Sequence, residues 1–130
     1  MSLHQSGEDY LEAILVLREK NGVVHSIDVA QYLGYSKPSV SRAVSLLKGE
    51  GYLVMEKDGR LELTEAGVEV AHNILERHCF LKQWLMDLGV SAETAEEDAC
   101  KIEHNISDET FRCLKLHTER RSSLQGQELK

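Results

Sequence analysis

The chain has 130 residues, of which 42% are hydrophobic and 28% are charged, a composition typical of one ordinary domain or of two small domains that share a core. No apolar run approaches the roughly 20 residues that a helix needs to cross a bilayer, and no basic-then-apolar leader opens the sequence, so we expect a cytoplasmic protein with no membrane partner. The three cysteines are widely spaced without a Cys-x-x-Cys pair, which argues against a disulfide scaffold and a structural zinc ribbon.

The formal net charge of −7 looks unfavourable for a nucleic-acid binder, because neutralisation of phosphates supplies much of the affinity for DNA. The distribution of the charge matters more than its sum. Residues 1–21 carry a net charge of −2, residues 22–63 carry 0 and residues 64–130 carry −5. The acid excess therefore lies outside the segment that we interpret below as DNA-binding, and divalent cations bound to it would reduce the repulsion of phosphate.

Three helices are predicted in the first 50 residues. An apolar stripe over residues 8–20 predicts the first helix. Ser26 is a candidate N-cap of the second helix, and Gly34 makes the turn that follows. Ser36 caps a third helix, in which Pro38 takes an early position where a missing N–H costs little.

A hairpin and further helices complete the predicted order. Two short β-prone runs flank Lys57-Asp58-Gly59, and Asp-Gly between such runs is a strong hairpin signal. A helix, a helix-turn-helix and a hairpin in this order indicate a winged helix. Thr64 then opens a long helix that Gly89 ends, and two more helices begin at Ser91 and Ser107.

Polar side chains dominate the exposed face of the third predicted helix. Arg42 is the best candidate for reading guanine, because its planar fork matches O6 and N7 together. Arg60 and three lysines, Lys37, Lys48 and Lys57, are better suited to contact phosphates. Such contacts position a protein on DNA without specifying the sequence. The alternative is a solvated face of a winged helix that binds protein, but the whole pattern favours DNA. The predicted DNA-binding residues are Ser36, Lys37, Pro38, Ser39, Ser41, Arg42, Lys48, Lys57 and Arg60.

Two groups of potential metal ligands stand on separate predicted helices. Cys100, Glu103 and His104 follow at i, i+3 and i+4, so a helix places them on one face, and Asp9 and Glu12 repeat the i, i+3 spacing near the start. Thiolate, carboxylate and imidazole together suit a divalent transition metal. Taken singly, Cys100 could be a small buried hydrophobic residue, and the two early acids could simply favour the helix dipole.

Two other classes of function remain open from the residues alone. A metal-independent winged-helix regulator could sense redox state through Cys79, Cys100 or Cys113, although we expect Cys79 and Cys113 to be small buried hydrophobic residues. An enzyme fits poorly, because the chain has no His-Glu-x-x-His motif, no nucleophile elbow and no glycine-rich phosphate loop. We therefore expect no enzymatic activity.

The chain resembles the iron- and manganese-dependent repressor family, which includes the diphtheria toxin repressor and the manganese transport regulator. The resemblance covers nearly the whole chain and ends near Arg121, without the third, SH3-like domain of the diphtheria-type members, so the architecture is similar to the short manganese branch. The segments that carry it are Glu8-Asp9-Tyr10-Leu11-Glu12, Val40-Ser41, Leu63-Thr64-x-x-Gly67, Arg77-His78 and Ile102-Glu103-His104 followed by Ser107-Asp108-Glu109.

The resemblance implies metal ligands by position. Asp9 and Glu12 match the two first-helix acids of manganese regulators, His78 matches a histidine ligand of both branches, and Glu103 with His104 matches a shared pair.

Three positions depart from the manganese pattern. Cys100 stands where that branch has glutamate and the iron branch has cysteine, and Lys82 stands where both offer an acid. Glu96 stands where the iron type has histidine, so Glu96 or Glu97 is a further candidate ligand. Oxygen-rich ligation suits Mn(II) while a thiolate favours softer ions, so the expected cofactor is Mn(II) in preference to Fe(II), with one or two ions per subunit.

The residues and the resemblance together predict a mainly α fold with a small β-hairpin wing. A winged helix-turn-helix DNA-binding domain is expected over residues 1–70, a helical metal-binding and dimerisation domain over 71–121, and a disordered tail over 122–130. The implied function is that of a transcriptional regulator and repressor of metal-ion homeostasis, in which metal binding orients the winged helices of a homodimer on a palindromic double-stranded operator.

Overall fold

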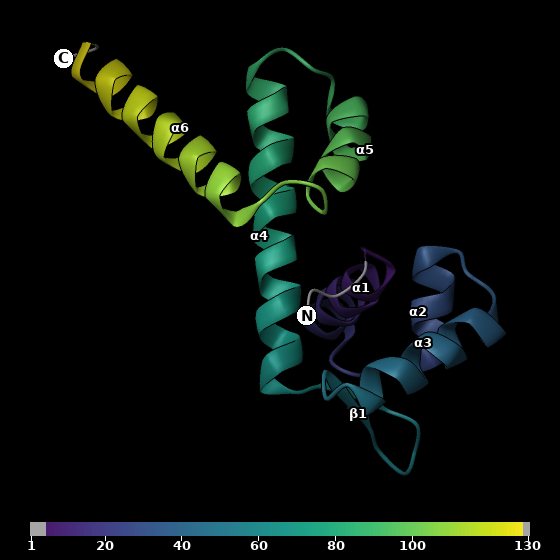
Figure 1. Ribbon diagram of the computed structural model, residues 1–130. Coiled ribbons are helices and arrows are strands. Elements are labelled where there is room, and N and C mark those ends of the chain that lie inside the picture. The colour runs from purple at the N-terminus through teal and green to yellow at the C-terminus, as the bar shows by residue number, and fades with distance from the viewer. Residues whose placement is uncertain (1–4, 129–130) are drawn as a thin grey trace. The chain divides into compact units, whose positions relative to one another are not determined.

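The computed structural model describes residues 5–128 and shows two compact units, which divide between Leu75 and Glu76 (Figure 1). Within the described residues the order of elements is the predicted one, mainly helical with a single hairpin. The elements are α1 (Gln5–Asn21), α2 (Ser26–Leu33), α3 (Lys37–Gly49), β1 (Leu53–Met55), β2 (Leu61–Leu63), α4 (Glu65–Asp87), α5 (Ala92–Ile102) and α6 (Asp108–Glu128). None of these helices combines the length and the hydrophobicity that a membrane crossing requires.

The helix-turn-helix forms from α2 and α3. Gly34 turns the chain with a φ of 73°, a conformation that glycine adopts without steric cost. Ser36 caps α3 as predicted, because its Oγ accepts the backbone N–H of Ser39 at 3.3 Å. The prediction that Ser26 caps α2 is wrong: Ser26 is the first helical residue and His25 is the N-cap. The Asp28 carboxylate accepts the backbone N–H of His25 at 2.8 Å, which fixes the start of the helix one residue earlier.

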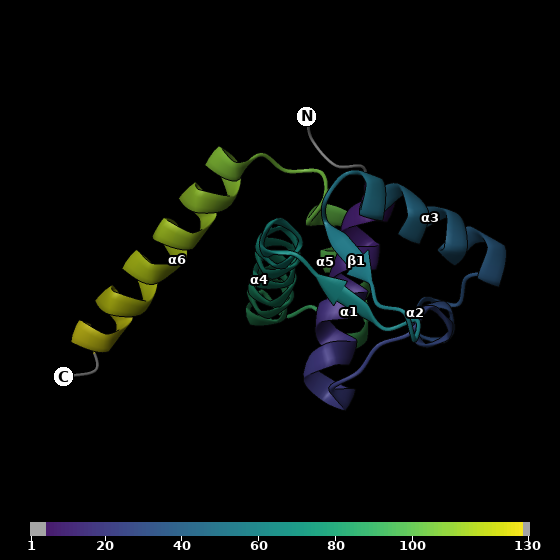
Figure 2. The same ribbon diagram turned by 90° about the horizontal axis from the view of Figure 1, so that it is seen from below.

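The hairpin is antiparallel and short. Leu53 pairs with Leu63 and Met55 pairs with Leu61. The N–H of Leu61 also donates to the carbonyl of Val24 at 2.8 Å, which ties β2 to the link between α1 and α2. Figure 2 shows the hairpin against α1.

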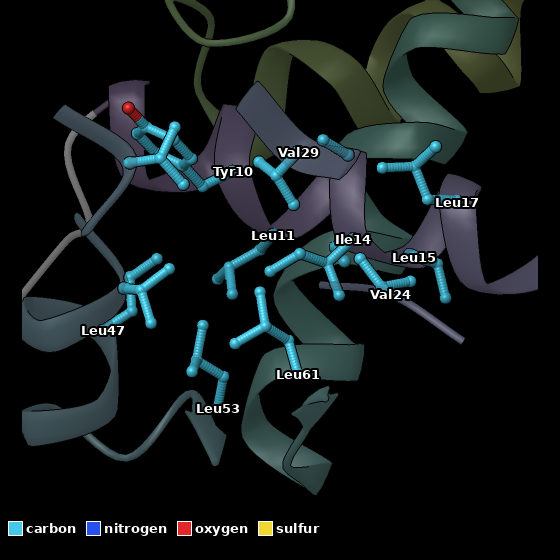
Figure 3. Close-up of a cluster of buried hydrophobic side chains, with 14 of the residues drawn as sticks. Tyr10, Leu11, Ile14, Leu15, Leu17, Val24, Val29, Leu47, Leu53 and Leu61 are labelled. Carbon is cyan, nitrogen blue, oxygen red and sulfur yellow. The ribbon is translucent and has the colours of Figure 1, made fainter. Parts of the chain in front are cut away.

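A hydrophobic core joins α1, α2, α3, the hairpin and the start of α4. The stripe on α1 places Leu11 and Ile14 at its centre, where both are almost completely buried. Figure 3 shows their side chains directed toward Val29, Leu53 and Leu61, which come from three other elements. Burial of each such side chain contributes about 1.5–3 kcal/mol, so this core supports the helix-turn-helix and the wing together.

The first turn of α4 packs directly on backbone. Thr64 Oγ1 accepts the N–H of Gly67 at 3.2 Å and donates to the carbonyl of Gly51 at 2.7 Å. A Cβ at position 67 would lie 2.0 Å from the carbonyl oxygen of Tyr52. Only glycine therefore allows the helix to approach the chain at this point.

The second unit contains the C-terminal half of α4 with α5 and α6, and Figure 1 shows α5 alongside that half of α4. Gly89 ends the turn after α4 with a φ of 104°. Ser91 and Ser107 are N-caps as predicted, since their Oγ atoms accept backbone N–H groups at 3.3 and 3.1 Å. α6 ends at Glu128, and the disordered tail expected over residues 122–130 stays a prediction. Residues 129–130 lie outside the described part, and the domain division at residue 70 stays a prediction.

Candidate metal centre and nucleic-acid interface

Three of the predicted ligands lie together in the second unit. His78 comes from α4, Cys100 from the last turn of α5, and Glu103 is the C-cap of α5. One potential ligand atom from each lies within 4.8 Å of the others. His78 Nδ1 is 2.7 Å from Oε2 of Glu103 and 3.7 Å from Sγ of Cys100. Spacing along α5 places the thiol and the carboxyl on one side, and packing of α5 beside α4 adds the imidazole.

Glu103 is the buried polar residue at the centre of this cluster, with 0% of its surface exposed. Its Oε2 meets His78, whereas its Oε1 is buried and has no hydrogen-bond partner among the described residues. That second oxygen lies 3.3 Å from Nε2 of His104, whose side chain is also buried. A buried carboxylate is costly unless it is paired or coordinates a cation. Imidazole, thiolate and carboxylate donors fit a divalent transition metal, so the residues present suit the ion that the sequence implies.

Glu96 lies on the other side of His78. Its Oε1 is 2.9 Å from Nε2 of His78, and its Oε2 is 3.0 Å from Nζ of Lys82. Burial opposes ionisation of this carboxyl, but the hydrogen bond from Lys82 and the neighbouring His78 outweigh it and lower its pKa. Glu96 was a candidate ligand, and both of its oxygens here have protein partners. The assignments of Glu96 and Glu97 as ligands stay predictions.

Arg77 holds the turn that carries Glu103, a role that the sequence did not indicate. Its Nη1 donates to the carbonyls of Glu103 at 3.1 Å and of Ile106 at 2.8 Å, while its Nη2 forms an ion pair with Asp108. The guanidinium also stacks 5.3 Å from the ring centre of Phe111. Arg77 appeared in the sequence only as the neighbour of His78, and no spacing rule connects it to a turn 26 residues away.

The other predicted ligands and the remaining cysteines are placed as follows. Asp9 and Glu12 lie three residues apart on α1, both partly buried, and their assignment as ligands stays a prediction. Cys79 and Cys113 are exposed, so the expectation that they are small buried residues is wrong. Neither cysteine is in a disulfide, and the same holds for Cys100.

The predicted DNA-binding residues lie on the first unit, on α3 and around the hairpin. Most are exposed; Ser39 and Arg60 are half-buried. The Arg60 guanidinium lies 2.9 Å from the Asp58 carboxylate, and the backbone N–H of Arg60 with its side chain lowers the pKa of that carboxyl. A phosphate contact by Arg60 would therefore compete with this ion pair. Arg42 is exposed on α3, as are Ser41 and Lys48. Its role in reading DNA stays a prediction.

A winged helix followed by a helical unit with a candidate metal cluster is the architecture of a metal-responsive DNA-binding regulator. Two family models match the chain. The iron dependent repressor N-terminal DNA binding domain matches residues 2–61, and the iron dependent repressor metal binding and dimerisation domain matches residues 64–122. The chain belongs to the iron-dependent repressor family.

Individual relatives agree with this assignment. The HTH-type transcriptional regulator MJ0568 of Methanocaldococcus jannaschii is 38% identical over 120 residues, which cover 91% of this chain and 96% of the relative. The transcriptional regulator MntR of Escherichia coli is 34% identical over 113 residues, which cover 87% of this chain and 73% of the relative. The solved structure of the manganese regulator SloR superposes with a TM-score of 0.78 at 28% identity, covering 92% of this chain but only 55% of that longer chain.

These matches confirm the resemblance, the fold class and the metal-dependent regulatory function predicted from the sequence. The matched domains are those that bind DNA, bind metal and dimerise. The relatives are transcriptional regulators, in agreement with the expectation of a non-enzymatic protein. The redox-responsive alternative finds no support among them.

Proposed function

We propose that this chain represses transcription in response to intracellular Mn(II) or Fe(II), and that the His78–Cys100–Glu103 cluster is the core of its sensing site. The observation that carries the proposal is the buried Glu103 carboxylate, which faces His78 and Cys100 with one oxygen lacking a hydrogen bond among the described residues. Relatives named as a manganese regulator and as MntR support manganese in particular.

Mn(II) is the preferred ion in this proposal. Asp9, Glu12 and Glu103 would offer hard oxygen ligands, whereas Cys100 adds a softer donor that also accepts Fe(II). His104 completes the proposed ligand set. The number of ions per chain, one or two, depends on whether the carboxylates of Glu12 and Glu103 each bridge two ions.

The mechanism follows from where the proposed ligands stand in the chain. Asp9 and Glu12 belong to the first helix of the DNA-binding unit, and the other ligands belong to the second unit. A bound divalent cation supplies positive charge that offsets repulsion among these acids. The orientation of the winged helix would then depend on metal, with a coupling typically about 1–3 kcal/mol.

The orientation of the winged helix affects DNA binding through the dimer. Two winged helices bind successive major grooves only when they are held roughly 34–36 Å apart, one turn of DNA, which implies a palindromic operator. In each subunit Arg42 would read a base, while lysines of α3 and the hairpin would contact phosphates. Hydroxyl groups of Ser36, Ser39 and Ser41 would let the backbone approach the groove.

The first test measures metal uptake. The apoprotein is dialysed anaerobically against Mn(II) or Fe(II), and the bound ions are counted by elemental mass spectrometry. We expect uptake of one or two Mn(II) per chain. Two bound Mn(II) would indicate a bridged site, one tightly held Fe(II) would move the chain to the iron branch, and no uptake of either would refute the sensor.

The matched variants are Glu103→Ala and Glu69→Ala. Removing the Glu103 carboxylate should abolish metal-stimulated DNA binding, measured by fluorescence anisotropy, while circular dichroism stays unchanged. Glu69 is an exposed glutamate of α4, so its removal should leave binding as in the original chain. Unchanged metal dependence in Glu103→Ala would rule out its assigned role.

A further inference from the structure

A row of four side chains, alternately acidic and basic, runs outward from the proposed metal centre. Glu103 Oε2 meets His78 Nδ1 at 2.7 Å, His78 Nε2 meets Glu96 Oε1 at 2.9 Å, and Glu96 Oε2 meets Lys82 Nζ at 3.0 Å. The row crosses from α5 to α4, back to α5 and again to α4. His78 and Lys82 are four residues apart, so they lie on the same face of α4.

Each end of the row has a different environment. The side chain of Glu103 is 1% exposed and that of His78 is 13% exposed, whereas Glu96 and Lys82 are 48% and 38% exposed. The inner end therefore offers donors shielded from water, and the outer end is a partly solvated ion pair. An exposed ion pair contributes little to the stability of the fold. The ion pair between Glu96 and Lys82 is therefore of interest for the place it occupies beside His78.

Without Lys82, the outer end would itself be a place for a cation. Glu96 would then keep one carboxylate oxygen without a protein partner at the outer edge of the cluster, and such an oxygen attracts a divalent ion. The lysine ammonium takes that place, in contact with Oε2 of Glu96, whereas His78 meets Oε1. A divalent ion would have to displace a resident positive charge.

We propose that Lys82 is a built-in cation that makes Glu96 a positioning residue for His78 and prevents a further metal ion from binding at the outer end. The proposal rests on the proposed function, because it assumes that His78 is a metal ligand. In this proposal Nε2 donates a hydrogen bond to Glu96, which leaves Nδ1 as the ring nitrogen that can bind an ion held by Glu103 and Cys100. Carboxylates that orient a ligating histidine in this way typically change metal affinity by about 10–100-fold when removed.

The decisive experiment changes the charge at position 82 and counts ions. The full-length chain, Lys82→Glu and Lys82→Arg are equilibrated with Mn(II), and the bound metal is measured by elemental mass spectrometry. The introduced carboxylate should join that of Glu96 as a second oxygen donor, so Lys82→Glu should bind one ion per chain more than the original protein. Lys82→Arg keeps the positive charge and should bind the original number. An equal number of ions in Lys82→Glu and the original chain would overturn the proposal.

A second pair of variants separates positioning from ligation. Glu96→Ala should bind the same number of Mn(II) ions as the original chain but with about 10–100-fold lower affinity. Glu93→Ala, an exposed glutamate of α5 outside the candidate ligands, serves as the matched control and should bind as the original chain does. Loss of one ion in Glu96→Ala would show that Glu96 is a ligand and overturn its positioning role.

The orientation of His78 provides a readout that does not depend on DNA binding. With diamagnetic Zn(II) in place of Mn(II), nitrogen-15 NMR of the histidine rings should show a proton on Nε2 of His78 in the original chain. Glu96→Ala should change that signal, and an unchanged signal would contradict the proposal. Absence of all metal uptake by the original chain would instead refute the proposed function, so the two failures are distinguishable.

Discussion

At the scale of single residues, Gly67 shows how close packing selects one amino acid. Its N–H is held by Thr64, and the carbonyl of Tyr52 occupies the space where a side chain would begin. A backbone carbonyl cannot rotate away as the end of a flexible side chain can. The position therefore tolerates hydrogen and nothing larger.

Gly67→Ala should destabilise the protein by about 1–3 kcal/mol, because an added methyl group must push α4 away from the chain at Tyr52. Urea denaturation followed by circular dichroism measures the change. Gly49→Ala is the control: Gly49 is helical with nothing within 4 Å of its Cβ position, so alanine there should be neutral or stabilising. Equal destabilisation by both changes would contradict the steric explanation.

Arg42 is the residue on which the proposed sequence recognition depends. Arg42→Ala should reduce discrimination between operator and altered DNA by about 1–3 kcal/mol at one base pair, because bidentate contact with guanine is lost. Lys48→Ala should instead weaken binding to all sequences and lower the salt slope by about 1. Fluorescence anisotropy against a panel of duplexes at several salt concentrations separates the two. If Arg42→Ala changes only the salt slope, Arg42 contacts phosphate.

At the scale of elements, the turn between α5 and α6 depends on α4. Arg77 bonds two carbonyls of that turn and pairs with Asp108 at the start of α6. Its side chain is only 12% exposed, so these charged hydrogen bonds are worth more than those at the open surface. The turn presents Glu103, and its geometry is therefore set by a residue outside the proposed ligands.

Arg77→Met should keep the aliphatic packing but loosen the turn that carries Glu103. We expect faster amide hydrogen exchange at residues 103–106 and weaker Mn(II) binding, because each lost hydrogen bond to a charged group costs about 1.5–3 kcal/mol. Hydrogen exchange with mass spectrometry and a metal titration measure the two effects. Arg112→Met, at an exposed position of α6, should change neither. Unaltered exchange in Arg77→Met would show that the turn at residues 103–106 is stable without Arg77.

Local signals were enough to predict the elements from the sequence. Ser36, Ser91 and Ser107 cap helices where expected, because capping needs only a hydroxyl and the N–H three residues on. The same rule chose Ser26 wrongly, since the competing Asp28 carboxylate acts on the residue before it.

Contacts between elements could not be predicted in the same way. The spacing of Cys100 and Glu103 placed both on one side of α5, but the approach of His78 depends on how α5 packs on α4. The contact of Lys82 with Glu96 depends on the same packing. A sequence pattern lists such residues as candidates, and only tertiary structure shows which of them meet.

At the scale of the whole molecule, the charge distribution sets the conditions for binding DNA. The net charge is −7, yet residues 22–63, which contain α3 and the hairpin, are neutral. Repulsion of DNA phosphates therefore comes from the acidic remainder of the chain. Metal bound by those acids would reduce the repulsion and, in the proposed mechanism, also orient the winged helix.

Removing metal with a chelator should weaken operator binding by about 5–150-fold, the usual range for coupling between two sites. Anisotropy titrations at constant ionic strength compare Mn(II), Mg(II) and chelator. Mg(II) has the same charge but binds thiolate and imidazole poorly, so it should restore little of the affinity. Equal stimulation by Mg(II) and Mn(II) would mean that charge neutralisation alone explains the effect.

The division between the two compact units falls at Leu75 and Glu76, in the middle of α4, with continuous helix on both sides. Proteases nick exposed loop tips in preference to regular helices, and this boundary offers no loop. Limited digestion should therefore cut first elsewhere, as at the exposed hairpin tip around Lys57, and should not release the two units as separate fragments. For anyone preparing half of this protein, a cut at the boundary would break a helix in two, so a piece that preserves α4 must begin or end outside residues 65–87.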